Sequence, residues 1–329
     1  MSGDPVLFAL QGSRDIGERV AARIGLALAP HEERDFDAGE HKARPLAEVG
    51  GRDVYVIHSL HGDRGQSAND KLVRLLFFVG ALKDAGADRV TAVVPYLAYA
   101  RKDRRTKPRD PVTTRYLAQL FEALGTDRIL TVEAHNVSAF ENSFRLCRPE
   151  HIPVAGVLAD HFAAQLGDRP VAVVSPDAGG NKRAELFRRE LEGRLGREVG
   201  KAIMDKHRSA GVVSGSVFAG EVRGRLAIVV DDLVSSGTTL VRAAQACRAA
   251  GAASVVAAAA HGLFTGGAPA LFGADGPDRI VVTDTVPLPA ALPPEAGDRI
   301  SQVGIGDLLG DVIGRLHRGE AVSELIAYD

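Results

Sequence analysis

Short runs of apolar residues alternate along the chain with longer stretches in which apolar residues recur at helical spacing. The runs predict strands and the stretches between them predict helices. In the first half we expect strands at Val6–Leu10, Val54–His58, Val90–Val94 and Ile129–Val132, and helices at Ile16–Leu28, Asp70–Ala85 and Val112–Leu124. In the second half we expect strands at Val171–Val174, Leu226–Val230, Ser254–Ala258 and Arg279–Val282, and helices at Lys182–Leu195 and Thr239–Ala249.

The predicted strands are apolar throughout instead of alternating, which is typical of a parallel sheet buried on both faces. The pattern therefore predicts an α/β protein. Pro149 and Pro153 interrupt the pattern near Arg148–Ile152, so we expect a domain boundary there. The predicted parts are residues 1–150, residues 151–304 and a C-terminal segment, residues 305–329, that packs back on the first domain.

Composition narrows the function classes. The 329 residues include 40 Lys and Arg and 42 Asp and Glu, so a formal net charge of −2 disfavours a general polyanion binder. Aromatic residues make up 5% and Trp is absent, which argues against base stacking and a nucleic-acid partner. Cys147 and Cys247 form no CxxC pair, so we interpret them as small core residues. No secretory signal or membrane-length apolar run is found, and we expect a soluble, cytoplasmic protein.

The segment Ile228–Leu240, IVVDDLVSSGTTL, is the most informative motif. A predicted strand ends at two carboxylates, and a turn of small residues leads into a helix; these positions are Asp231, Asp232, Ser235, Ser236, Gly237, Thr238 and Thr239. Backbone amides at such a helix N-terminus suit a phosphate, and the carboxylates can hold ribose hydroxyls directly or through Mg²⁺. An ordinary capped turn is the alternative, but two carboxylates at the end of a buried strand are costly without a role. The motif resembles the phosphoribosyl-binding loop of type I phosphoribosyltransferase-fold proteins.

Four further motifs occur in a fixed order: PYLAYARKDRR (Pro95–Arg105), VEAHN (Val132–Asn136), VVSPDAGGNKRA (Val173–Ala184) and DKHR (Asp205–Arg208). With the loop, they resemble the ribose-phosphate pyrophosphokinases, or phosphoribosyl pyrophosphate (PRPP) synthetases, from about Val6 to about Pro287. The resemblance implies two stacked type I phosphoribosyltransferase-like domains, each a mainly parallel sheet flanked by helices. It also implies transfer of diphosphate from Mg-ATP to the 1-hydroxyl of ribose 5-phosphate, which yields PRPP and AMP, with ribose 5-phosphate held by the Asp231–Thr239 segment.

The same resemblance assigns nucleotide-binding residues in the first two motifs and the SPD segment. Arg101, Lys102 and Asp103 match an ATP-binding segment, ARQDR in the family, and a guanidinium fork suits polyphosphate oxygens. His135 and Asp177 match residues that lie at the Mg-ATP triphosphate, so they are the candidate metal-binding residues and Mg²⁺ is the implied cofactor.

Two other assignments come from the resemblance alone. Lys206 and Arg208 match a Lys-x-Arg pair on a loop that closes over the transferring diphosphate, and they are the candidate catalytic residues. Phe36 and Glu40 match a loop that reaches the adenine of a neighbouring subunit, so we expect a homodimer or a larger assembly of this chain. Ala38 stands where the family has an aspartate.

Departures from the family pattern keep alternatives open. Lys102 replaces a glutamine, Glu133 an aspartate and Ser235 the middle aspartate of the phosphate loop. The departures at Ala38, Lys102 and Glu133 favour a catalytically silent regulatory subunit, whereas intact Lys206 and Arg208 argue against it. A phosphoribosyltransferase that uses PRPP would need no ATP motifs. A phosphate- or nucleic-acid-binding module would rest on the six basic residues among the nine of Arg101–Arg109.

Overall fold

The computed structural model describes residues 5–209 and 212–326, and the side chains within them except those of residues 205–217. The described chain forms two compact units. The first unit contains residues up to Ile152 together with Ile305–Leu325, and the second contains Pro153–Gly304 with Ile326. Helices and largely parallel strands alternate in both units, so the predicted α/β class is confirmed.

The sheet of the first unit has five parallel strands in the order β1-β4-β5-β6-β7. These are β1 (Val6–Ala9), β4 (Asp53–Ile57), β5 (Arg89–Val94), β6 (Arg128–Val132) and β7 (Arg148–Ile152). All but β7 are almost completely buried, which explains their continuous apolar sequences. The segment that we expected to be a boundary forms β7, an edge strand, where Pro149 is tolerated because one side of the strand needs no ladder donor.

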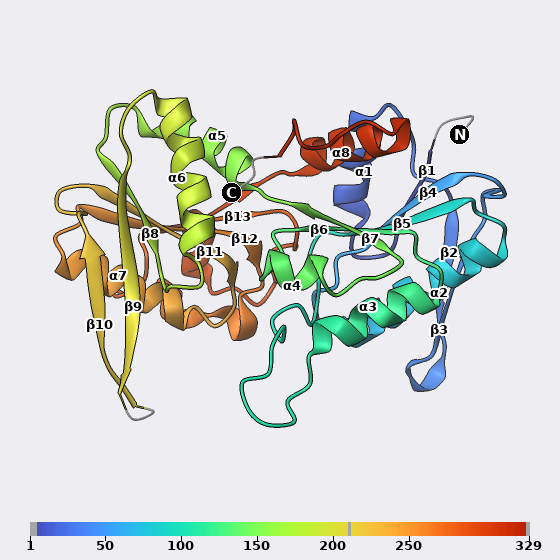
Figure 1. Ribbon diagram of the computed structural model, residues 1–329, viewed down its shortest axis with the longest axis horizontal. Coiled ribbons are helices and arrows are strands. Elements are labelled where there is room, and N and C mark those ends of the chain that lie inside the picture. Colours follow the sequence, from blue (N-terminus) through green and yellow to red (C-terminus); the bar gives the residue numbers. More distant parts are fainter. Residues whose placement is uncertain (1–4, 210–211, 327–329) are drawn as a thin grey trace. The chain divides into compact units, whose positions relative to one another are not determined.

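Helices cover both faces of this sheet (Figure 1). They are α1 (Arg14–Arg23), α2 (Ala68–Asp84), α3 (Thr113–Ala123), the short α4 (Val137–Glu141) and α8 (Gly306–Arg318). Helices α1 and α8 pack closely at Gly306 and Gly310, where added Cβ atoms would lie 2.6 Å from Arg19 Cβ and from Arg23 Cγ. The predicted extension of α1 to Leu28 is wrong: Gly25 adopts φ +70°, and the chain then turns back to lie beside β1.

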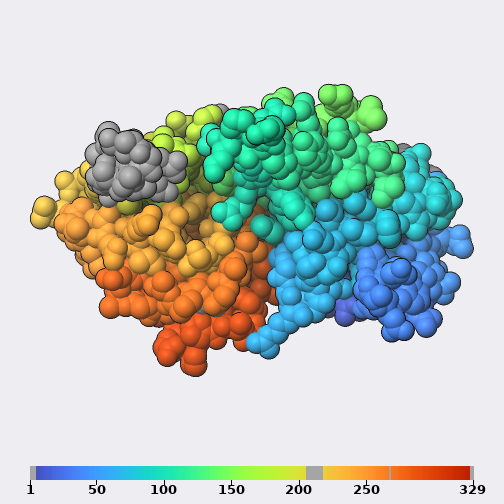
Figure 2. Space-filling model, turned by 90° about the horizontal axis from the view of Figure 1, so that it is seen from below, coloured from blue at the N-terminus to red at the C-terminus, as the bar shows by residue number. Residues whose placement is uncertain are grey.

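A charged hairpin, which we did not predict from the sequence, projects from the first unit (Figure 1). Its atoms belong to the blue surface in Figure 2. It consists of β2 (His31–Asp35), a 3₁₀ turn (Asp37–Gly39) and β3 (His41–Pro45). Arg74 on α2 has a buried side chain and donates hydrogen bonds to Glu33 Oε2, at 2.9 Å, and to Asp35. This ion-pair network, made by a residue far along the chain, holds the hairpin in place.

The sheet of the second unit has seven strands in the order β10-β9-β8-β11-β12-β13-β14, with only β10 antiparallel to its neighbour. The strands are β8 (Val171–Ser175), β9 (Gly200–Ser209), β10 (Val212–Gly220), β11 (Leu226–Val234), β12 (Ser254–Gly262), β13 (Arg279–Thr283) and β14 (Ile300–Val303). The helices are α5 (Ala155–Leu166), α6 (Asn181–Leu195) and α7 (Thr238–Ala249), with 3₁₀ turns at Thr265–Gly267, Pro269–Phe272 and Pro294–Arg299.

Strand β8 lies between β9 and β11, so the chain leaves β8 toward one side of the sheet and later returns on the other. Such a switch point opens a crevice at the carboxyl ends of the two diverging strands, where α/β proteins bind ligands. Elsewhere, Cys147 and Cys247 are both buried and free, as expected of core residues. Within the described part of the chain, no helix is long and apolar enough to span a membrane.

Candidate functional site

In the first unit, the predicted nucleotide residues follow the adjacent strands β5 and β6. Arg101, Lys102 and Asp103 lie in the loop before α3, and His135 lies in the turn before α4. Asn136 joins the two segments, because its Nδ2 donates a hydrogen bond of 2.6 Å to Asp103 Oδ2. The structure therefore brings together the two sequence motifs that the family resemblance assigns to ATP.

Two threonines at the start of α3 fix the backbone on either side of Arg101. The Thr113 hydroxyl donates to the carbonyl oxygens of Tyr99, at 3.0 Å, and Lys102, at 3.3 Å. Thr114 Oγ1 lies 3.3 Å from the same Tyr99 oxygen. Tyr99 itself has φ +64°, a conformation that side chains rarely adopt and that often occurs at functional sites. Arg101 is thus an exposed guanidinium on a firmly held backbone.

Lys102 has a partner within its own loop. Its Nζ donates a 2.6 Å hydrogen bond to Asp110 Oδ2, which also accepts from the backbone amides of Thr106, at 3.0 Å, and Lys107, at 2.9 Å. These contacts, that of Lys102 above all, hold the pKa of the Asp110 carboxyl well below its usual range. In this conformation Lys102 organises the loop of residues 101–112, and the contact with ATP stays a prediction.

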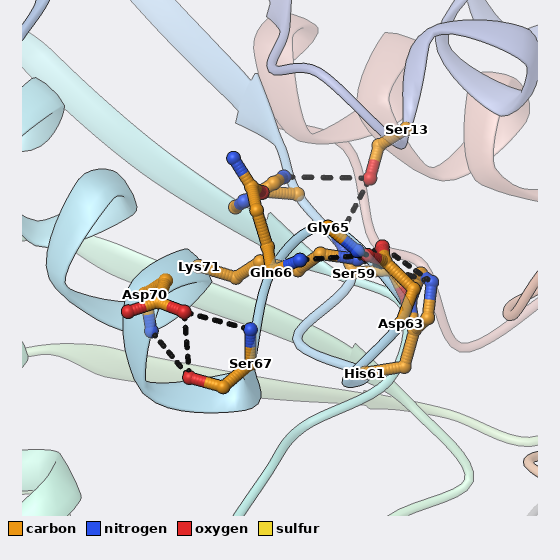
Figure 3. A network of polar contacts seen from close by, with 10 residues as sticks. Ser13, Ser59, His61, Asp63, Gly65, Gln66, Ser67, Asp70 and Lys71 are labelled. Carbon is orange, nitrogen blue, oxygen red and sulfur yellow. Dashed lines mark hydrogen bonds and ion pairs between the residues drawn. The ribbon is translucent and has the colours of Figure 1, made fainter. Parts of the chain in front are cut away.

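A buried polar network supports this region from the loop that follows β4 (Figure 3). Ser59 Oγ accepts a hydrogen bond of 3.3 Å from the Tyr96 amide, in the segment that leads to Arg101. Lys71 on α2 is 1% exposed and donates to Asp63 Oδ2, at 2.6 Å, and to His61 Nε2, at 3.1 Å. Burial lowers the pKa of Lys71, and its contact with the Asp63 carboxylate opposes that shift. The network fixes the β4 loop, against which the nucleotide segment rests.

Phe36 and Glu40 lie at the tip of the hairpin. The Phe36 amide donates to the Glu40 carbonyl at 2.7 Å, and both side chains are exposed. The Arg34 guanidinium lies 5.2 Å from the centroid of the Phe36 ring. The tip lies apart from the loop of residues 101–112 (Figure 1), so the structure does not bring Phe36 and Arg101 together within one chain.

In the second unit, the acidic pair lies within β11 and not after it. The strand continues to Val234 because β12 continues beside it, with Asp231 opposite Ala259. Burial and the neighbouring Asp232 carboxylate raise the pKa of Asp231 to about 7, whereas the Arg183 charge opposes the rise. Asp231 can therefore exchange a proton near neutral pH, which a strand-end aspartate in water cannot do.

The small-residue turn after β11 forms the N-terminus of the 12-residue α7. Gly237 is the N-cap and has φ +80°. A Cβ atom on Gly237 would lie 2.3 Å from Leu271 Cγ, so both the conformation and the packing require glycine here. The turn lies at the positive end of the helix dipole of α7, which is the end that an anion prefers.

Asp177 follows β8, the other strand at the switch point. Its Oδ1 accepts from the Gly180 amide at 3.0 Å, and the Ser175 hydroxyl donates to its backbone carbonyl at 2.7 Å. A Cβ on Gly180 would lie 3.2 Å from Ser175 Oγ, so this glycine keeps the turn compact. Because β8 and β11 are neighbours, Asp177 and Asp231 belong to the same carboxyl edge of the sheet.

We expected Lys206 and Arg208 to lie on a loop, but the structure places both residues on β9. Their backbones pair with Ser216 and Val213 of β10 in a long antiparallel hairpin, because the two strands continue their ladder through the motif. The side chains of both residues lie outside the described part of the structure, so their catalytic role stays a prediction.

Comparisons with known proteins agree with the motifs. Residues 5–125 match the family model described as the N-terminal domain of ribose phosphate pyrophosphokinase, and residues 212–327 match that of the phosphoribosyl synthetase-associated domain. Ribose-phosphate pyrophosphokinase 1 of Streptococcus pneumoniae serotype 4 is 34% identical over 98% of this chain and 97% of its own. The chain belongs to the ribose-phosphate pyrophosphokinase family. A putative ribose-phosphate pyrophosphokinase 2 of Lactiplantibacillus plantarum is 33% identical over 97% of this chain and 95% of its own.

A solved structure supports the same conclusion for the fold. The crystal structure of phosphoribosylpyrophosphate synthetase from Mycobacterium smegmatis matches with a TM-score of 0.84 and 28% identity, and covers 96% of this chain and 100% of that one. The family resemblance that the five motifs indicated is thereby confirmed, as is the fold that it implied.

Several residues of the site escaped the sequence analysis. Asn136 belongs to the VEAHN motif, but we predicted no role for it. Asparagine is a common N-cap residue, so its position before a helix could have indicated one. Asp110 could have been suspected as the single carboxylate that follows a strongly basic run. Lys71 falls on the apolar face of its helix, four residues before Leu75, and a lysine there needs a buried partner.

Proposed function

We propose that this chain is a PRPP synthetase that transfers the β,γ-diphosphate of ATP to the 1-hydroxyl of ribose 5-phosphate and releases AMP. The chain matches ribose-phosphate pyrophosphokinases over nearly its full length. The observation that carries the proposal is that the same chain contains two candidate binding centres. One is the acidic pair and phosphate loop at the switch point of the second unit. The other is the linked pair of nucleotide segments in the first unit.

Ribose 5-phosphate is the substrate of the loop centre. Its phosphate lies on the amides and hydroxyls of Ser235–Thr239, at the positive end of α7. Its ring hydroxyls donate to Asp231 and Asp232 in the adjacent strand β11, whose carboxylates are the acceptors when they are ionised. A phosphate site that lies next in sequence to two hydroxyl-binding carboxylates suits a pentose 5-phosphate.

ATP is held by side chains on several segments of the chain. Arg101 contacts the polyphosphate oxygens, and Asp103 and His135 act from the neighbouring segments that Asn136 links. Phe36 and Glu40 act on the adenine of a neighbouring subunit, in a homodimer or a larger assembly. Lys206 and Arg208 place positive charge on the migrating diphosphate.

Mg²⁺ is the cofactor in this proposal. Mg²⁺ prefers oxygen ligands and usually keeps several waters, being held by one or two carboxylates together with substrate phosphates. The described residues contain no cluster of three or more His, Cys, Asp or Glu side chains that could hold a metal by themselves. Asp177, with one carboxylate oxygen on the Gly180 amide, fits a site of one carboxylate completed by phosphates, and His135 offers a nitrogen donor. When bound, the ion would neutralise phosphate charge.

The chemical step needs positioning more than covalent help from the protein. The 1-hydroxyl oxygen forms a bond to the β-phosphorus, the bond from that phosphorus to the α,β-bridging oxygen breaks, and AMP leaves with that oxygen. The hydroxyl proton passes to water as the new bond forms, and ionised Asp231 stabilises the ribose orientation through its hydrogen bond. The positive side chains lower the barrier by acting on charge that moves during transfer.

The deciding experiment is an AMP-release assay with ATP, ribose 5-phosphate and Mg²⁺, coupled to detection of PRPP. A PRPP synthetase releases AMP and PRPP in equal amounts only when ribose 5-phosphate is present. A silent regulatory subunit gives neither product, and a phosphoribosyltransferase consumes added PRPP when a base is supplied. Repeating the assay with GTP and CTP measures how far the change at Ala38 has relaxed the preference for adenine.

A further inference from the structure

A strained turn follows β12 beside the proposed ribose 5-phosphate loop. Its first and last residues, Phe264 and Ala268, have φ +41° and φ +42°, although neither is glycine. Gly266 between them has φ +64°. Left-handed conformations of this kind persist in ordinary residues only where the surrounding structure imposes them, and they cluster at ligand-binding sites.

The end of β11 imposes this conformation. The amides of Leu263 and Phe264 both donate to the carbonyl oxygen of Val234, each at 2.9 Å, and Val234 directly precedes Ser235. The Phe264 ring is 1% exposed, and a Cβ atom on Gly262 would lie 2.8 Å from its Cε2. The turn is therefore locked to the residue from which the phosphate loop departs.

Two side chains carry this support into the loop itself. Thr265 Oγ1 lies 3.0 Å from Ser235 Oγ, which links residues 30 positions apart in the chain. Leu271, completely buried, fills the space beside Gly237 that a Cβ atom would otherwise enter. The loop is held at its first residue by a hydroxyl and at its helix N-cap by an aliphatic side chain, before any ligand arrives.

We infer that Thr265 is a positioning residue for ribose 5-phosphate: its hydroxyl fixes the orientation of the Ser235 hydroxyl and, with it, the conformation of the phosphate loop. The inference rests on the proposed function of that loop. Preorganisation of this kind improves affinity because the loop loses less conformational freedom when the phosphate binds. It also gives Ser235, which replaces an acidic residue of the family pattern, a neutral hydrogen-bond partner.

The test compares Thr265→Val with Thr265→Ser. Valine keeps the shape of the side chain and removes the hydroxyl, so KM for ribose 5-phosphate should rise about three- to tenfold, the usual effect of one lost hydrogen bond. KM for ATP should stay within about twofold of the wild-type value, since the change touches only the loop. Thr265→Ser restores the hydroxyl and should return KM for ribose 5-phosphate to near the wild-type value.

A double-mutant cycle with Ser235→Ala separates positioning from general support of the fold. In the Ser235→Ala background, Thr265→Val should have almost no further effect, because the partner hydroxyl is already absent. Fully additive effects, or an unchanged KM for ribose 5-phosphate in Thr265→Val, would overturn the inference.

Gly237→Ala distinguishes failure of this inference from failure of the proposed function. If Gly237→Ala weakens ribose 5-phosphate binding while Thr265→Val leaves it intact, the loop binds the phosphate and only the role of Thr265 is wrong. If neither variant changes the KM for ribose 5-phosphate, the phosphate does not bind at this loop and both proposals are wrong.

Discussion

Asn136 uses both atoms of its amide, and each connects a different part of the nucleotide region. Its Oδ1 accepts from the Ala139 amide at 3.1 Å and caps α4, while its Nδ2 donates to Asp103 Oδ2 at 2.6 Å. The orientation of the short helix α4 and the position of the basic loop are therefore coupled through one side chain. His135, the adjacent residue, has its backbone placed by the same arrangement.

The first prediction tests this coupling. Asn136→Ser keeps an N-cap oxygen but cannot reach Asp103, so the loop should lose its anchor while α4 remains. KM for ATP should rise about three- to tenfold, the usual effect of losing one hydrogen bond, with KM for ribose 5-phosphate unchanged. Steady-state AMP release measures both constants.

An exchange of the two side chains provides the control. In the double variant Asp103→Asn with Asn136→Asp, the new amide at position 103 can donate to the new carboxylate, which also caps α4. Partial recovery of KM for ATP, relative to Asn136→Asp alone, supports the anchoring role. No recovery, with thermal stability equal to wild type, would show that the contact does not matter for ATP.

The second prediction concerns Lys206. Its charge is expected to act on the diphosphate during transfer, so Lys206→Ala should reduce kcat by about 100-fold or more and change either KM by much less. Lys206→Arg keeps the charge and should retain more activity. Rapid-quench measurement of the chemical step gives the decisive number, and a kcat equal to wild type would remove Lys206 from the mechanism.

The third prediction uses two glycines in the same backbone conformation. Gly237 has φ +80° and a Cβ atom there would collide with Leu271, whereas Gly224 has φ +69° and open space around the Cβ position. Strain of the left-handed conformation should cost each alanine variant about 1 kcal/mol of stability, and the collision with Leu271 should cost Gly237→Ala about 1–3 kcal/mol more. Only Gly237→Ala should also weaken ribose 5-phosphate, by about tenfold or more, because displacements of about 1 Å at a site have large effects.

Calorimetric titration of ribose 5-phosphate into the two variants checks the contrast. Gly224→Ala reports what backbone strain alone does to the protein, so it is the matched control. Equal affinities in both variants would place the phosphate elsewhere on the chain.

Much of this architecture could be predicted because the information is local. The buried strands β4, β5 and β8 and the first five residues of β11 are mostly apolar, and the helix α2 begins at a capping box formed by Ser67 and Asp70. The end of α1 was predicted wrongly because Leu26 and Leu28 continue the apolar pattern after the left-handed Gly25 has already ended the helix. The spacing of apolar residues alone therefore did not show that α1 ends before the segment that lies beside β1.

The charged hairpin could not be predicted, because its segments have no apolar run and its stability comes from Arg74, about 40 residues away. The same holds for the loop contacts: the pairing of Ser235 with Thr265 and of Asn136 with Asp103 joins residues 30 and 33 positions apart. The sequence motifs identified Ser235, Asn136 and Asp103 as parts of candidate sites, but only the folded structure shows which side chains are in contact.

The fourth prediction follows from the raised pKa of Asp231. The free protein holds a proton on this carboxyl below about pH 7, whereas ribose hydroxyls are bound best by the ionised form. Binding of ribose 5-phosphate near pH 6 should therefore release a proton, and affinity should fall by about tenfold per pH unit at lower pH. Calorimetry in two buffers of different ionisation enthalpy measures the release directly.

Stability should respond to pH with a definite sign at the same residue. The folded pKa lies above that of an unfolded aspartate, so this group favours folding below about pH 4, and that contribution is lost as the pH rises to about 7. Asp231→Asn should raise Tm at pH 8 and have little effect at pH 4, while reducing the proton release to the part that comes from the phosphate of ribose 5-phosphate itself. Pronounced destabilisation at pH 8 would contradict the assignment of an unfavourable charge to Asp231.

The last prediction concerns assembly. Phe36 is 42% exposed at a hairpin tip, with the Arg34 guanidinium over its ring, so part of the aromatic surface is accessible to another subunit. If Phe36 completes the ATP site of a neighbour, Phe36→Ala and Asp177→Ala damage different halves of each shared site. Each variant alone should be inactive.

When the two variants are mixed and exchange subunits, half of the dimers are hybrids, and each hybrid has one intact site. About a quarter of the wild-type activity should therefore return. Native mass spectrometry counts the hybrids, and a mixture of either variant with wild-type chains calibrates the exchange. Hybrids without activity would mean that each chain completes its own nucleotide site, and that the exposed Phe36 serves another contact.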